Sequence, residues 1–83
     1  MTLTVDRIKR WEKGSTLGFM DINVEGYVTI KGFKVMKNKK GDLFISVPST
    51  KSGDKFYNDV KFSAEAYKRL QEIGLKAFQE STN

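Results

Sequence analysis

Hydrophobic and polar residues alternate along most of the N-terminal two thirds of the chain, which is typical of strands with one buried face. The pattern predicts five strands. The first, second and fifth span residues 3–11, 17–24 and 56–62. The third begins at Val28, and the fourth ends at Pro48 because proline cannot donate a hydrogen bond to a neighbouring strand.

The turn at residues 25–27 follows from the register of the apolar positions. A two-residue turn would place Ile22 opposite Thr29. A three-residue turn instead pairs Val24 with Val28 and keeps one apolar face continuous. We therefore predict the three-residue turn.

The apolar positions of the third strand change from even to odd numbers at Gly32. A glycine at such a change favours a β-bulge or a sharp bend. The alternative is that Gly32 allows another backbone or a ligand to approach closely. The chain then predicts a hairpin with residues 38–40 at its tip, in which Val35 lies opposite Leu43 and Phe33 lies opposite Ile45.

One helix is predicted after the last strand. Ser63 is a good N-cap, and Glu65 suits the positive end of the helix dipole. An apolar stripe at helical spacing should pack on the sheet and comprises Ala66, Tyr67, Leu70, Ile73, Ala77 and Phe78. Gly74 weakens the helix by about 1 kcal/mol relative to alanine. The expected fold is α+β, an antiparallel or mixed five-stranded sheet with hairpins and one C-terminal helix, in a single domain of residues 1–83.

Composition limits the chemistry. A chain of 83 residues has a small core, so its stability should be marginal and a dimer would increase the buried area. The absence of histidine and cysteine excludes the usual zinc site, an imidazole base and the common nucleophile pairs. We therefore predict no enzymatic activity, no cofactor, no metal ion and no small-molecule substrate. Without a long apolar run or a signal-peptide pattern, a cytoplasmic protein with no membrane partner is expected.

Three segments carry a resemblance to a known family. They are LFISVPSTKSGDKFYNDVK at 43–61, TVDRIKR at 4–10 and VTIKGFKVMKNKKGDLF at 28–44. The chain resembles the SpoVG family of small bacterial regulators. The resemblance implies a compact strand-rich core, a homodimer and binding to nucleic acid. Where the family has a His-Pro pair after its last strand, this chain has Lys61, Phe62 and Ser63.

Lysines mark the first candidate binding surface. The net charge is +5, and residues 31–41 contain five lysines and no acidic residue. We expect the hairpin lysines to neutralise phosphates, giving affinity that depends on salt and little on sequence; the candidates are Lys34, Lys37, Lys39 and Lys40. The alternative is that such lysines provide solubility and block pairing at the sheet edge.

Two further segments could contact phosphates. The predicted loop at 49–55 offers hydroxyl groups and two lysines, with Ser49, Lys51 and Lys55 as candidates. On the first strand, alternation places Arg7 and Lys9 on one face and Arg10 on the other.

Aromatic residues could form a second apolar face of the sheet. Phe44 and Tyr57 fall on the parity opposite the predicted core positions, which include Phe56. Such a face could be a dimer interface or could stack on unpaired bases, and the dimer is preferred for so small a domain. Trp11 is expected to cover a sheet edge or to join this interface.

The sequence thus predicts a homodimeric, non-catalytic regulator that binds nucleic acid, DNA before RNA. The alternatives are a single-strand binder that uses the aromatic face, and a protein-interaction module without a nucleic-acid role.

Overall fold

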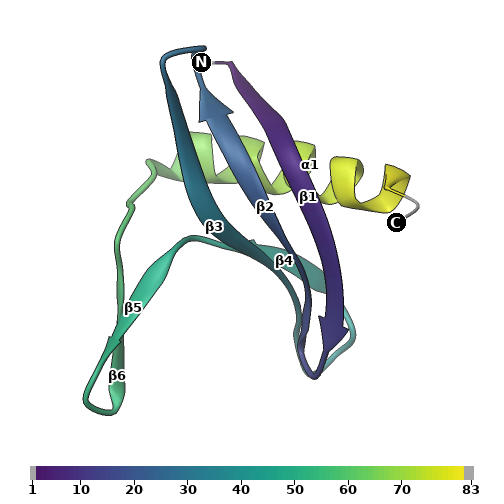
Figure 1. Ribbon diagram of the computed structural model, residues 1–83, viewed down its shortest axis with the longest axis vertical. Coiled ribbons are helices and arrows are strands. Elements are labelled where there is room, and N and C mark those ends of the chain that lie inside the picture. Colours follow the sequence, from purple (N-terminus) through teal and green to yellow (C-terminus); the bar gives the residue numbers. More distant parts are fainter. Residues whose placement is uncertain (1, 82–83) are drawn as a thin grey trace.

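The computed structural model describes residues 2–81 and contains six strands and one helix (Figure 1). The predicted α+β class is confirmed. The strands are β1 (Leu3–Lys13), β2 (Thr16–Val24), β3 (Val28–Lys37), β4 (Leu43–Ser46), β5 (Ser49–Ser52) and β6 (Lys55–Asn58), and the helix is α1 (Ala64–Glu80). Strands β1 to β4 form an antiparallel sheet in sequence order, and β5 pairs only with β6. The structure therefore contains two sheets where a single five-stranded sheet was expected.

The predicted β2–β3 turn is confirmed. Val24 pairs with Val28, and Ile22 pairs with Ile30. The Asn23 side chain fixes the turn, because its Oδ1 accepts a hydrogen bond of 2.8 Å from the Gly26 amide. Short polar side chains of this kind stabilise turns by bonding to nearby backbone groups.

The predicted bulge at Gly32 is also confirmed. Ile22 pairs with Ile30 and Met20 pairs with Phe33, so β3 has one more residue than β2 between these pairs. Gly32 has φ +90°, a conformation that other residues rarely adopt. The bulge lets the apolar face remain continuous although the parity of the sequence changes.

The predicted register of the β3–β4 hairpin is wrong. Val35 lies opposite Ile45, and Lys37 lies opposite Leu43. The turn spans residues 38–42 because the Asn38 side chain organises a longer loop, in which its Oδ1 accepts hydrogen bonds from the Lys40 amide at 2.9 Å and the Asp42 amide at 3.0 Å. The bonds from the Asn38 side chain to its own loop thus stabilise a turn that is longer than the one predicted from the alternation of apolar residues.

The segment predicted as a loop at 49–55 is part of a hairpin, and the fifth strand is shorter than predicted. β5 and β6 bond to each other and extend away from the main sheet (Figure 1). Phe56, which was expected in the core, is 66% exposed because nothing within residues 2–81 packs over this hairpin as a layer. Phe62 reaches the core instead, with its ring centroid 6.0 Å from that of Phe33.

The core lies between α1 and one face of the four-stranded sheet. The fully buried residues include Met20, Ile22, Phe33, Val35 and Ile45 from the strands and Leu70 from the helix. Ser63 is the N-cap, as predicted, and its Oγ accepts a hydrogen bond from the Ala66 amide. The buried stripe of the helix is narrower than predicted, since Tyr67 is 38% exposed. No helix among residues 2–81 is long and apolar enough to cross a membrane.

Two contacts hold α1 close to the sheet. Gly74 is buried in the contact, where a Cβ atom would lie only 2.8 Å from Cγ1 of Ile45. The Gln71 amide group bonds to both backbone groups of Ile45, at 2.7 Å to its nitrogen and 2.8 Å to its carbonyl oxygen. Since β4 is an edge strand, Gln71 also covers part of the free edge that another strand could pair with.

Candidate nucleic-acid interface

The face of the four-stranded sheet opposite α1, here called the outer face, carries several basic and aromatic side chains among polar and acidic ones. Register places Lys9, Phe19, Lys34 and Ser46 in one row across the four strands. The core residues occupy the other face, because successive side chains of a strand point to opposite sides. Two predicted residues, Lys9 and Lys34, therefore belong to one surface although they are 25 positions apart in the sequence.

A shallow depression on the outer face brings more cations together. Its lining includes Arg7, Lys9 and Lys31 around the ring of Phe19. Asp21, which lies opposite Arg7 on the neighbouring strand, adds one carboxylate to the depression. Arg7 and Lys9 share this face as predicted, and Lys31 joins them because it follows the inward-facing Ile30 on β3.

The turns β1–β2 and β3–β4 lie side by side at one end of the sheet (Figure 1). The Lys37 amide donates a hydrogen bond of 3.0 Å to the Ser15 carbonyl, which joins the two turns. This end of the sheet, here called the basic end, has four exposed lysines: Lys13, Lys37, Lys39 and Lys40. Sequence reasoning missed Lys13 because the first strand was ended at Trp11. Its position, two residues after Trp11 and four after Lys9, was the available signal.

Trp11 lies at the junction of the outer face and the basic end. Its side chain is 49% exposed, and its ring meets that of Phe19 edge to face with centroids 6.0 Å apart. The Nζ atoms of Lys9 and Lys13 each lie over the Trp11 ring, 5.9 Å from its centroid. An exposed aromatic ring between two cations is thus held in place by a neighbouring ring.

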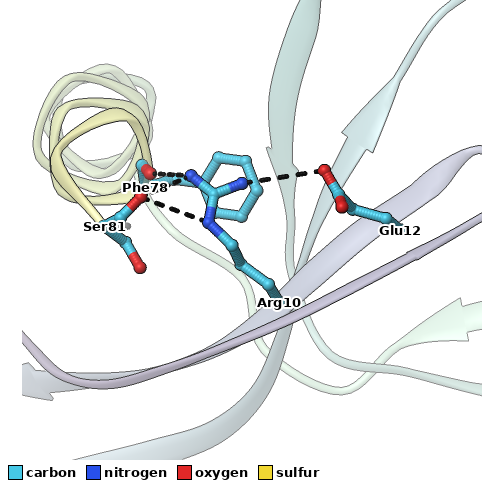
Figure 2. Close-up of polar contacts among 4 residues, drawn as sticks. All are labelled: Arg10, Glu12, Phe78 and Ser81. Atoms are coloured by element: carbon cyan, nitrogen blue, oxygen red, sulfur yellow. Dashed lines mark hydrogen bonds and ion pairs between the residues drawn. The ribbon is translucent and has the colours of Figure 1, made fainter. Parts of the chain in front are cut away.

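Arg10 has a different role from its basic neighbours (Figure 2). Its guanidinium donates hydrogen bonds to the Phe78 carbonyl at 2.8 Å and to the Ser81 carbonyl at 2.7 and 3.2 Å. It also lies 4.1 Å from the centre of the Phe78 ring, and Glu12 is 3.9 Å away. Arg10 therefore satisfies the carbonyl groups at the C-terminal end of α1, where a cation is favoured by the helix dipole.

The β5–β6 hairpin carries the other predicted phosphate contacts. Ser49, Lys51 and Lys55 are exposed on it, and the Lys51 Nζ lies 5.8 Å from the Phe56 ring. Thr50 is engaged within the hairpin, since its hydroxyl bonds to the Asp59 carboxylate at 2.8 Å. The hairpin lies apart from the basic end, at the other side of the molecule in this view (Figure 1). The structure therefore separates two groups of lysines.

The predicted aromatic face does not form as one surface. Phe44 lies half-buried on β4 of the main sheet, whereas Tyr57 is 56% exposed on β6 of the small sheet. Trp11 is on the outer face near β1 and β2, apart from Tyr57. The expectation that Phe44 and Tyr57 share a sheet face is wrong, because β6 pairs with β5 and never joins the main sheet.

Among residues 2–81, no group of three or more histidine, cysteine, aspartate or glutamate side chains is placed to hold a metal ion. The outer face and the basic end combine cations with aromatic rings, which is the chemistry that binds phosphates and bases.

The fold and this surface define a class: a small α+β protein whose antiparallel sheet is packed against a helix on one side and is basic on the other. The SpoVG family model matches residues 1–80, and the chain belongs to the SpoVG family. The match continues through α1, so the change at residues 61–63 does not end the similarity.

Two relatives are similar along nearly their whole length. A protein of Lachnospira eligens named "Putative septation protein SpoVG" is 30% identical over 98% of this chain and 94% of its own length. A protein of Lachnoclostridium phytofermentans with the same name is 30% identical over 95% of this chain and 87% of its own length.

Proposed function

We propose that this protein is a non-catalytic regulator that binds nucleic acid, DNA or RNA, through the outer face and the basic end. The observation that carries the proposal is the presence of eight cations on the outer face and at the basic end: Arg7, Lys9, Lys13, Lys31, Lys34, Lys37, Lys39 and Lys40. Binding of a polyanion here would release condensed counterions, and this release favours association at low salt.

The surface suits contacts to the phosphate backbone more than reading of base edges. Lysines predominate, and lysine binds phosphate as a compact point charge, without the rigid fork of donors of an arginine. α1 lies on the opposite side of the sheet, so it does not present a recognition helix beside these cations. We expect weak sequence preference and a strong dependence on salt.

The direct test is a fluorescence anisotropy titration with labelled single-stranded DNA, duplex DNA and RNA at two salt concentrations. The double variant Lys9→Glu/Lys39→Glu should bind all probes more weakly. The matched control is Lys68→Glu/Lys76→Glu, which changes the net charge equally at two exposed positions of α1. Equal losses for the two variants would mean that only net charge matters. No binding to any probe at low salt would favour a protein-interaction module instead.

We propose a homodimer that covers the β5–β6 hairpin. Every strand residue of this hairpin is exposed, including Phe56 at 66% and Tyr57 at 56%. A two-stranded sheet alone is marginally stable in water, and a partner subunit would bury its aromatic side chains. In this dimer the Lys51 and Lys55 ammonium groups would lie at the polar rim of the interface, where they would contact phosphates at a second place; Lys51→Glu/Lys55→Glu tests this in the same titration.

A further inference from the structure

We propose that Trp11 is a stacking platform for an unpaired base, so that the preferred ligand is single-stranded nucleic acid. This inference rests on the proposed function and adds the strand state and the residue that selects it. Stacking requires an accessible aromatic face, because a base inside a duplex is already covered by its neighbours on both sides.

The ring of Trp11 is both accessible and oriented. It is 49% exposed, although Trp is a residue type that is usually well buried. Its contact with Phe19 is edge to face, with an interplanar angle of 68° and a centroid distance of 6.0 Å, so Phe19 supports the ring. This arrangement leaves area for a base while limiting the rotation of the indole group.

Charges flank the platform in the arrangement that a strand of nucleic acid needs. Lys9 and Lys13 precede and follow Trp11 along β1, and the Nζ atom of each lies over the ring, 5.9 Å from its centroid, so a stacking base would take the place of a flexible lysine head group. A base stacked on Trp11 would therefore bring its neighbouring phosphates toward these two lysines. Beyond Lys9, the depression lined by Arg7 and Lys31 continues the positive surface.

The same charges argue against a second copy of this chain as the occupant. In a two-fold symmetric contact the same patch meets itself, so this surface would face its own cations. Asp21 is the carboxylate that lines the depression, against Arg7, Lys9 and Lys31. Like charges placed opposite one another cost energy, whereas a polyanion complements them.

The tryptophan itself provides the readout. The chain has one tryptophan, so its intrinsic fluorescence reports on this site alone. Titration of the full chain with an oligothymidylate of about 15 nucleotides should change the Trp11 emission as binding saturates. In the anisotropy assay, Trp11→Ala should weaken binding to this strand by about 5- to 100-fold, and Trp11→Phe should restore most of it. A duplex of equal length should bind both variants and the unchanged protein alike.

The control is Tyr27→Ala, which removes an aromatic side chain that is 89% exposed in the turn at the other end of β2. It should bind the strand like the unchanged protein. Circular dichroism of each variant tests folding, and Trp11→Phe keeps the inference testable if Trp11→Ala unfolds.

Salt-sensitive binding with no change in Trp11 emission and full affinity of Trp11→Ala would overturn this inference and leave the proposed function intact. Absence of any binding would overturn both. A dimer that dissociates on Trp11→Phe substitution, with unchanged affinity for the strand, would also overturn it in favour of an interface between copies.

Discussion

Arg7 and Arg10 lie on the same strand and point to opposite faces of the sheet, which gives them separable roles. Arg7 lines the depression on the outer face, and Arg10 bonds to the last carbonyl groups of α1. Arg10→Ala should lower the free energy of unfolding by about 2 kcal/mol, because the carbonyl groups lose hydrogen bonds from a charged donor. Urea denaturation followed by circular dichroism measures this loss.

Arg7→Ala is the matched control. It should change the stability by less than about 0.5 kcal/mol, since the residue is exposed. Its expected effect is on binding, where loss of one phosphate contact to a single strand reduces the slope of log K against log salt by about 0.7. A large loss of stability in Arg7→Ala, or none in Arg10→Ala, would contradict the assignment of roles.

Gly18 is a position where the absence of a side chain allows close packing between β1, β2 and α1. A Cβ atom there would lie 2.8 Å from the Lys9 carbonyl oxygen and 2.9 Å from Cε1 of Phe78. The backbone cannot yield easily, so Gly18→Ala should cost about 1–3 kcal/mol in thermal or urea unfolding. Gly74→Ala should cost less than Gly18→Ala, because the gain in helix propensity of about 1 kcal/mol offsets part of the contact with Ile45. The opposite order would argue against these close approaches.

Elements differ in how far the sequence determines them. The β2–β3 turn, the bulge at Gly32 and the N-cap Ser63 were predictable, because each depends on neighbours within a few positions. The β3–β4 register was not predictable. The alternation of apolar residues does not show how many residues the turn contains, and here the bonds from the Asn38 side chain make the turn longer. The small sheet of β5 and β6 was not predicted for a related reason. The sequence of a short strand indicates that it pairs with another strand, but not whether the pair joins the main sheet.

The site shows the same division. Alternation along β1 placed Arg7 and Lys9 on one face, which the structure bears out. Nothing local to the sequence shows that Lys34 lies in the row of Lys9, or that the two turns of the basic end touch. These relations depend on register and on the contact between Lys37 and Ser15, which join distant parts of the chain.

The β5–β6 hairpin gives a prediction at the scale of the element. In hydrogen exchange at low protein concentration, the amides of residues 49–58 should exchange faster than those of β2 and β3, because the hairpin lacks buried contacts. At higher concentration a dimer should protect them, and Phe56→Ser/Tyr57→Ser should remove this protection and give a monomer in light scattering. Tyr27→Ser serves as control. A dimer that persists in the double variant would place the interface elsewhere.

At the scale of the whole molecule, the two faces of the four-stranded sheet have different roles. α1 buries one face of the four-stranded sheet and covers part of its β4 edge through Gln71, so this side supplies stability. In the part of the chain that the structure describes, no helix covers the outer face, which carries several of the cations. This division predicts that substitutions on the outer face affect binding more than folding.

The central claim is that the outer face and the basic end bind nucleic acid, and the salt dependence of binding tests it most directly. We would measure the affinity for a labelled single strand of about 15 nucleotides by anisotropy over a series of salt concentrations. If about six phosphates are neutralised, log K should fall with log salt with a slope of about −4. Lys9→Glu/Lys39→Glu should make the slope shallower, and Lys68→Glu/Lys76→Glu should not. No binding at the lowest salt, or the same slope for both double variants, would contradict the claim.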